Sequence, residues 1–213
     1  MYANADGIWL LRAKCLADPK PLNTSNVNYY PGCTLANWLN GDYFNTFDAA
    51  VRNVIMTVKV PYADVGSYSY FWAGDHGVDA RIFILSVSEQ RAWGTRDKYT
   101  NGPASGYVLQ YFKDTNEGSD AKRDVTSDTS TDTVPYWTRD TVMNNRHNKP
   151  DRMCCIECGY WTGGDDPHYR MGGSCGFGNT DVAGTVGSRG SYVRPALVLP
   201  KSAQIDSDMN VIA

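Results

Sequence analysis

Apolar residues recur at helical spacing in one stretch of the chain, residues 34–56. They lie three or four positions apart on both sides of Gly41-Asp42, where the pattern is interrupted. Thr46 and Asp48 are residue types that cap helices, and either could begin the second piece. The pattern therefore predicts two short helices that are separated at Gly41-Asp42.

Elsewhere, apolar residues alternate with polar ones or gather in short β-branched runs, which is typical of strands. The run at 134–140 has the composition of a buried strand, whereas 106–112 fits a helix or a strand. Residues 142–191 are rich in loop-forming residues and are predicted to contain two short strands, near 153–161 and 180–186. The strands predicted from the apolar pattern are 5–15, 56–62, 80–90, 134–140 and 192–200.

Two stretches hold little that a core could bury. Residues 114–133 are polar and charged, which predicts a loop or an insertion, and residues 201–213 are expected to form a tail. Strands and helices do not alternate regularly enough for a parallel sheet with crossover helices. We therefore predict a single α+β domain over residues 1–213, with two short helices early and irregular antiparallel strands late.

Composition and charge exclude several classes of function. The net charge of −3 provides no basic surface for nucleic acid or for anionic lipid. No apolar run approaches the roughly 20 residues that a membrane span needs, so no membrane insertion is expected. Residues 1–21 lack the basic start and the apolar centre of a signal peptide, so none is expected. Cys15 and Cys33 stand alone and are expected to be small buried residues.

The remaining cysteines crowd into the late loop as Cys154, Cys155, Cys158 and Cys175. Cys155-x-x-Cys158 has the spacing of a zinc ligand pair, which His168 and Cys175 could complete. A disulfide from Cys175 to one of the other three is a second interpretation. Free, partly buried thiols are the third and the favoured one, because a single C-x-x-C pair is a weak zinc signal. We expect no metal and no cofactor.

Catalytic motifs are absent from the sequence. It contains neither a G-x-S-x-G nucleophile elbow nor an H-E-x-x-H metal motif. Asp165 and Asp166 are adjacent in a Gly-rich loop, where a solvated turn is more frequent than an acid/base couple or a calcium site. The glycines of 172–179 follow no apolar strand and precede no helix, so they do not predict a phosphate site. No catalytic residue is predicted.

The late loop has the composition of a binding surface instead. It combines Tyr, Trp, Arg, Asn, Ser and Gly, as antibody paratopes do, and recognition commonly uses loops that a rigid framework positions. For Tyr160 and Trp161 the alternative, packing beneath the loop, stays open. The predicted ligand-binding residues are Asn144, Arg146, His147, Tyr160, Trp161, Asp165, Asp166, His168, Tyr169 and Arg170.

Four motifs in order resemble those of a family of bacterial and phage domains of unknown function. The family pattern is W-L-N…F…F, then D-x-[IV]-F-L-L-S-x-x-E, then [WY]-W-[LT]-R-[SD], and finally G-V-R-P-A-L. The resemblance covers about residues 8–200, and Tyr192 stands where the family has its last glycine. The matching residues are Trp38, Leu39, Asn40, Phe44 and Phe47; Ile82, Phe83, Leu85, Ser86 and Glu89; Tyr136, Trp137, Thr138 and Arg139; and Val193, Arg194, Pro195, Ala196 and Leu197.

This resemblance implies a C-type-lectin-like fold, similar to that of the variable proteins made by diversity-generating retroelements. Residues 140–191 would then be the variable, ligand-facing segment, although this segment is unusually long and Cys-rich. Trp137 and Arg139 before it, and Arg194 and Pro195 after it, would be fixed clamps. Arg194 is expected to pair with a buried carboxylate or with backbone carbonyls.

The resulting hypothesis is a non-enzymatic domain that binds a protein or glycan ligand at a virion or cell surface. Two alternatives stay open. One is a cysteine enzyme similar to formylglycine-generating enzymes, with Cys158 and Cys175 as its reactive pair. The other is a structural module of a phage tail or cell surface.

Overall fold

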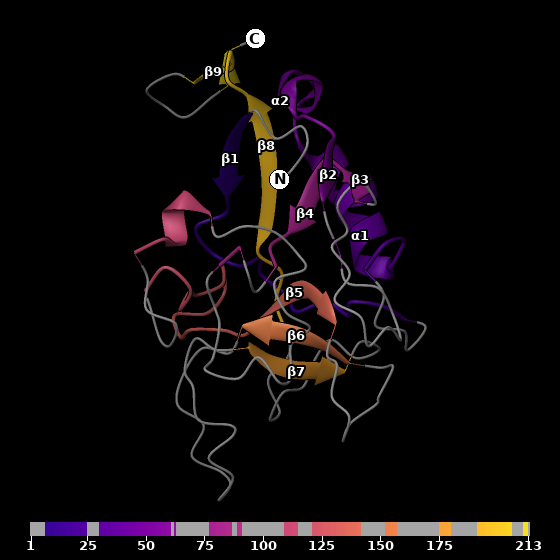
Figure 1. The fold of residues 1–213 in the computed structure, drawn as a ribbon, viewed down its shortest axis with the longest axis vertical. Helices are drawn as coiled ribbons and strands as arrows, with labels where there is room; N and C mark the ends of the chain where they lie inside the picture. The colour runs from indigo at the N-terminus through magenta and orange to yellow at the C-terminus, as the bar shows by residue number, and fades with distance from the viewer. Residues whose placement is uncertain are drawn as a thin grey trace, which may run out of the picture.

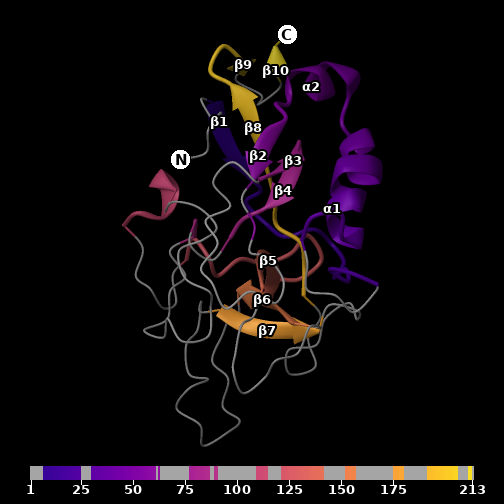
Figure 2. The same cartoon turned by 45° about the vertical axis from the view of Figure 1, so that its right-hand side comes forward.

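The computed structural model describes residues 7–24, 30–60, 62, 77–86, 89–90, 109–114, 121–141, 152–156, 175–179, 191–205 and 211–212. Over these residues the fold is mixed α+β, with small antiparallel sheets and few helices, as the sequence predicts. The helical segment lies along one side of a central sheet. A second sheet crosses the lower end of this central sheet (Figures 1 and 2).

The central sheet pairs the beginning of the chain with its end. It has three antiparallel strands in the order β1-β8-β4, which are Gly7–Leu11, Pro195–Pro200 and Ile82–Ile84. Trp9 pairs with Val198, and Phe83 pairs with Ala196 across the same central strand. The predicted strands at 5–15 and 192–200 are thereby confirmed, and the one at 80–90 is confirmed only over its first half.

Two hairpin-like pairs flank this sheet. β2 (Val58–Val60) pairs with β3 (Val78–Ala80), and β9 (Gln204–Ile205) pairs with β10 (Val211–Ile212). The predicted strand at 56–62 is therefore present but short. The region 106–112, which fitted either a helix or a strand, contains the 3₁₀ turn η3 (Gln110–Phe112).

The helical stretch breaks later than its sequence predicts. α1 (Thr34–Trp38) runs through a π-helical turn, η1 (Leu39–Tyr43), into the 3₁₀ turn η2 (Phe44–Thr46), and α2 (Ala49–Val54) follows. The prediction of a break at Gly41-Asp42 is wrong, because this pair lies inside η1 with the helix continuing past it. Phe47 is extended and Asp48 takes the N-cap position of α2.

Tertiary packing explains why the helix crosses Gly41. A glycine inside a helix costs only about 1 kcal/mol, which burial of neighbouring residues can exceed. Leu39 and Phe44 are both buried, on either side of Gly41-Asp42. The turn that leads into α1 is encoded locally. Gly32 has a positive φ of 71°, and the Cys33 N–H donates to the Tyr30 carbonyl over 3.1 Å, as in a type II Pro-Gly turn.

The second sheet, in the order β5-β6-β7, contains Tyr136–Thr141, Arg152–Ile156 and Cys175–Asn179. β5 confirms the buried strand predicted at 134–140, since its residues 136–139 are buried. β6 overlaps the strand predicted near 153–161, whereas the strand predicted near 180–186 lies outside the described residues.

The polar stretch 114–133 is partly buried where the structure describes it. Arg123, Val125 and Ser127 are buried, which corrects the expectation that little in this stretch could be buried. Backbone bonds fix it to the chain after β1, because the Cys15 N–H donates to Thr126 over 2.9 Å and the Asp128 N–H donates to Cys15 over 3.1 Å. A polar segment can be buried when partners of this kind satisfy its hydrogen bonds.

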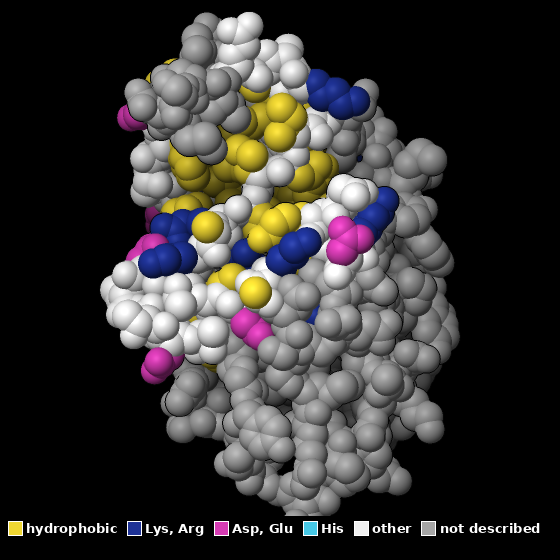
Figure 3. Space-filling view, turned by 90° about the vertical axis from the view of Figure 1, so that its left-hand side faces the viewer, with side chains coloured by type: hydrophobic (Ala, Val, Ile, Leu, Met, Phe, Trp, Pro, Cys, Tyr) yellow, Lys and Arg dark blue, Asp and Glu magenta, His cyan; other side chains and the backbone are white. Residues whose placement is uncertain are grey.

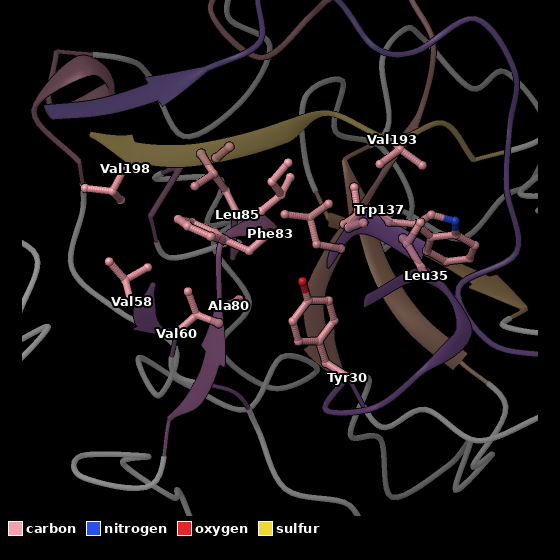
Figure 4. Packing of buried hydrophobic residues seen from close by; sticks show 14 of the residues in the cluster. Tyr30, Leu35, Val58, Val60, Ala80, Phe83, Leu85, Trp137, Val193 and Val198 are labelled. Carbon is pink, nitrogen blue, oxygen red and sulfur yellow. The ribbon is translucent and has the colours of Figure 1, made fainter. Parts of the chain in front are cut away.

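The hydrophobic core lies between the helical segment and the central sheet and continues down to β5 (Figure 4). Trp9 meets Phe83 edge-on, with ring centroids 5.3 Å apart. The largest fully buried apolar side chains of the core are Trp137, Tyr30, Tyr136, Phe83, Phe112, Leu22, Leu35, Leu39, Ile82 and Ile84. The core therefore joins the elements that carry all four sequence motifs.

The face that carries β1 exposes hydrophobic side chains. Hydrophobic side chains gather in its upper half, with Lys and Arg below them (Figure 3). Ile8 of β1 is 37% exposed. Of the helices in the described part of the chain, none has the length and apolar character to cross a membrane.

Candidate functional site

The ten predicted ligand-binding residues lie outside the described residues, so their positions are not assigned. What the structure describes is the base from which their segment leaves and to which it returns. We call this base the root frame. It consists of Ser86, Glu89, Gln90, Arg123, Tyr136, Trp137, Arg139, Tyr192 and Arg194.

Residues 140–191 form the late segment. Backbone hydrogen bonds join the residues on either side of it. The Trp137 N–H donates to the Tyr192 carbonyl over 3.0 Å, and the Tyr192 N–H donates to the Pro135 carbonyl over 2.8 Å. The indole Nε1–H of Trp137 donates to the Lys20 carbonyl over 2.7 Å, and the Trp137 side chain is fully buried. The chain therefore enters and leaves residues 140–191 at adjacent positions, of which Trp137 is buried and Tyr192 is partly buried.

Two strands of the late segment, β6 and β7, pair in order onto β5 of the root frame and form a sheet. Trp137 of β5 pairs with Cys155 of β6, and the register shifts at an irregularity between Trp137 and Thr141. β7 then pairs with β6 along its length, from Arg152 opposite Asn179 to Ile156 opposite Cys175. The lower sheet thus begins on the frame and carries the chain into the predicted binding segment.

A buried ion pair lies at the centre of the root frame. Arg139 and Glu89 are both fully buried, and the Arg139 Nη2 is bonded to the Glu89 Oε1. The Arg139 Nη1 also donates to the Ile84 carbonyl over 2.7 Å. The second oxygen of Glu89 accepts the Ser86 N–H over 2.8 Å, and the Ser86 hydroxyl oxygen accepts the Glu89 N–H over 3.0 Å. The Ser-x-x-Glu motif therefore closes a turn after β4 and presents its carboxylate to Arg139.

The electrostatics of this pair follow from burial. Desolvation raises the pKa of Glu89, and the Arg139 guanidinium and the Ser86 N–H oppose that shift. The guanidinium lies 6.0 Å from the centre of the Phe83 ring, within the range of a cation–π contact. Both carboxylate oxygens of Glu89 accept hydrogen bonds. This geometry holds β5, the strand that leads into the late segment, against β4.

Arg194 fixes the other end of the segment through backbone carbonyls. Its Nε donates to the Arg12 carbonyl over 2.9 Å, and its Nη1 donates to the Lys122 carbonyl over 2.7 Å. Its guanidinium lies 5.6 Å from the centre of the Tyr136 ring. Of the two partners expected for Arg194, the backbone carbonyls are the ones observed.

Gln90 connects the two halves of the frame. The Tyr136 hydroxyl donates to the Gln90 Oε1 over 2.7 Å, and the Gln90 Nε2 donates to the Ser86 carbonyl over 3.2 Å. The Arg123 Nη1 donates to the Gln90 carbonyl over 3.0 Å. Gln90 and Arg123 were not predicted as site residues, because the first was assigned to a strand and the second to a loop or an insertion. The Ser-x-x-Glu spacing, which is typical of a capping turn, could have indicated that the strand ends before Gln90.

Cys15 and Cys33 are buried, as predicted. Cys33 also caps α1, since its Sγ accepts the Ala36 N–H over 3.3 Å. Burial raises the pKa of the Cys33 thiol to about 11. It therefore stays protonated at neutral pH, which disfavours reaction as a nucleophile.

The crowded cysteines are placed only in part. Cys154 and Cys155 lie on β6 and Cys175 on β7, whereas Cys158 and His168 lie outside the described residues. In the backbone register of this sheet, Cys155 pairs with Gly176, and Cys175 pairs with Ile156. Over the described residues, no group of three or more His, Cys, Asp or Glu could hold a metal ion.

The Cys33 pKa predicts how stability changes at alkaline pH. The folded pKa, about 11, exceeds the ordinary value of 9.0, so its contribution is complete below pH 9 and is lost as pH rises through 11. Cys33→Ser keeps a cap acceptor but does not titrate, so it should remove about 2 kcal/mol of this loss in urea unfolding. Burial also raises the pKa values of Tyr30 and Tyr43, and these two groups contribute to the loss in both proteins. Equal pH dependence in the two proteins would contradict the assignment.

A family model described as a domain of unknown function (DUF6273) matches residues 6–201. No curated protein and no solved structure matches the chain.

Proposed function

The chain belongs to the DUF6273 family, and from this premise and the root frame we propose that it is a non-enzymatic binding domain with a C-type-lectin-like fold. Residues 140–191 are its ligand-facing segment, and the ligand is a protein or a glycan on a target surface. The domain acts at the surface of a virion or a cell. In this proposal it is a variable protein of a diversity-generating retroelement.

The observation that carries the proposal is the way the root frame holds both ends of this segment. The backbones of Trp137 and Tyr192 are hydrogen-bonded to each other. Arg139 and Arg194, near the two ends of the segment, are buried. Side chains of a surface loop can change without loss of the fold when the loop's ends are fixed by a packed core. Such a frame suits a surface whose specificity is set by the residues between its ends.

The chemistry of the segment supports recognition of a protein or glycan. Tyr, Trp and Arg side chains provide most of the binding energy at many protein interfaces. They are frequent in paratopes because they offer a large contact area and polar groups at low entropic cost. Tyr160, Trp161, Tyr169 and Arg170 are the residues of these types that we expect to contribute most.

Alanine at each of these four positions should weaken binding without changing the fold. The wild-type chain is first tested on a printed glycan array and on purified cell-surface proteins, and affinities are then measured on the probe it binds best. Each substitution should cost about 1 kcal/mol or more, a loss of at least about fivefold. The melting temperature should change by less than about 2 °C, because the proposal assigns these side chains to ligand contact and not to the core.

Tyr111→Ala is the matched control, because Tyr111 is an exposed aromatic residue outside the segment, with 53% of its surface accessible. It should leave both affinity and melting temperature unchanged. Four alanine variants that fail to fold would show that the four side chains belong to the core. A wild-type chain that binds neither class of probe would also contradict the proposal.

A further inference from the structure

The backbone of Lys20 contacts both ends of the late segment. Its N–H donates to the carbonyl of Ser191, the last residue of the segment, over 3.2 Å. Its carbonyl accepts the indole Nε1–H of Trp137, in the strand that leads into the segment, over 2.7 Å. Ser191 and Trp137 are both fully buried. These two bonds fix the separation between the strand that enters the late segment and the chain that returns from it.

The chain before Lys20 runs beside the returning chain, and the two are bonded irregularly. The Arg12 N–H donates to the Pro195 carbonyl over 3.0 Å, and the Leu16 N–H donates to the Val193 carbonyl over 2.9 Å. The donors are therefore four residues apart, whereas the acceptors are two apart. In a β-ladder both chains advance together and form more bonds per residue. This pairing therefore depends more than a ladder does on side-chain contacts.

The side chain of Lys20 provides such a contact with the helical segment. Its Nζ lies 4.2 Å from the centre of the Trp38 ring, within the range of a cation–π contact, and both residues are partly buried. Trp38 is stacked against Tyr43, with ring centroids 5.2 Å apart. Residues five apart meet here because α1 runs into the π-helical turn η1, in which hydrogen bonds join residues five apart.

The Trp38 ring is the partner that the structure shows for the Lys20 ammonium. In the described part of the chain, the ion pairs are formed by Arg12, Lys59 and Arg139, and not by Lys20. Lys14, in the same stretch, has an exposed side chain. The contact with Trp38 therefore distinguishes Lys20 from its neighbouring lysine.

We propose that Lys20 is a positioning residue of the late segment. Its backbone fixes the distance between the two ends of the segment, and its ammonium holds that backbone against α1. Lys20 lies outside the four motifs that suggested the family. The inference rests on the proposed function, because the placement of the ends affects recognition only if the segment presents a binding surface.

The test is hydrogen exchange measured by NMR on the full chain without ligand. Lys20→Met keeps the apolar stem and removes the charge. It should speed exchange of the Trp137 backbone and indole N–H groups by about two- to fivefold, as loss of a partly exposed cation–π contact predicts. Exchange in β8, which reports on the core, should match wild type. Lys20→Arg keeps a cation for Trp38 and should restore the wild-type rates. Lys14→Met is the matched control and should change neither group of rates.

Equal acceleration at Trp137 and in β8 would show a contribution to global stability alone and would overturn the proposal. Unchanged exchange in Lys20→Met, or no recovery in Lys20→Arg, would overturn it as well.

Affinity is then measured on the probe that the wild-type chain binds best. Lys20→Met should lose about two- to fivefold in affinity, and Lys20→Arg should stay within about twofold of wild type. Equal affinity of wild type and Lys20→Met would overturn the positioning role. Because the exchange measurement involves no ligand, a chain that binds no probe contradicts the proposed function, and the exchange rates still decide whether Lys20 holds the two ends.

Discussion

Replacing Arg139 by Met should lower the free energy of unfolding by about 3–5 kcal/mol, because it leaves the carboxylate of Glu89 buried without its cation. Both side chains are fully buried, so water cannot replace the lost partner. The Ile84 carbonyl, which accepts from Arg139 over 2.7 Å, also loses its donor. Urea unfolding monitored by tryptophan fluorescence measures the change.

A double-mutant cycle isolates the pair itself. Glu89→Met alone should be about as harmful as Arg139→Met, whereas the double variant should lose less than the sum of the two changes. Lys59→Met is the control, because it breaks the exposed Lys59–Asp79 pair, whose side chains are 45% and 63% exposed. That change should cost less than about 1 kcal/mol. Additive losses at Arg139 and Glu89 would contradict the central place of this pair in the root frame.

Replacing Asn40 by Ala should cost about 2–4 kcal/mol, because its side chain connects the helical segment to β4 through four hydrogen bonds to the backbone. Its Nδ2 donates to the Ala36 and Ile82 carbonyls, each over 2.9 Å. Its Oδ1 accepts the Arg81 N–H over 2.8 Å and the Ile82 N–H over 3.1 Å. Equilibrium unfolding in urea measures the loss.

Two further variants show whether these bonds are the cause. Asn40→Asp keeps both accepted bonds and loses both donated ones, so its stability should fall between that of wild type and that of Asn40→Ala. Asn37→Ala is the matched control on the same helix, since Asn37 makes one exposed bond, to the Gly32 carbonyl. It should cost well under 1 kcal/mol. Equal losses for Asn37→Ala and Asn40→Ala would contradict this role for Asn40.

Much of the fold was predictable because local patterns set it. β5 and β8 were predicted from their apolar runs, and the start of α1 from the apolar spacing that begins at residue 34. The position of the helix break was not predictable locally. Gly41-Asp42 is a poor helical sequence that burial of Leu39 and Phe44 overrides. The burial of Arg123 was missed for a similar reason, because its partner is the carbonyl of Gln90, distant in the sequence.

The site was predictable in composition but not in arrangement. Glu89, Arg139 and Arg194 all belong to the motifs that suggested the family, yet each motif is unremarkable when taken alone. Packing of β5 against the turn after β4 brings Glu89 to Arg139 across 50 positions of sequence, and no local pattern encodes that contact. Three of the four motifs contribute residues to the root frame that supports the late segment, whereas the predicted ligand-binding residues of that segment stay a prediction.

The most direct measurement for the central proposal is deep sequencing of codons 130–200 in the source population. If residues 140–191 are a diversified, ligand-facing segment on a fixed frame, substitutions should fall at scattered positions inside that range. The codons for Tyr136, Trp137, Arg139 and Arg194 should stay constant, because these side chains are buried in the frame. A segment as invariant as the frame, or substitutions spread equally across both, would contradict the proposal.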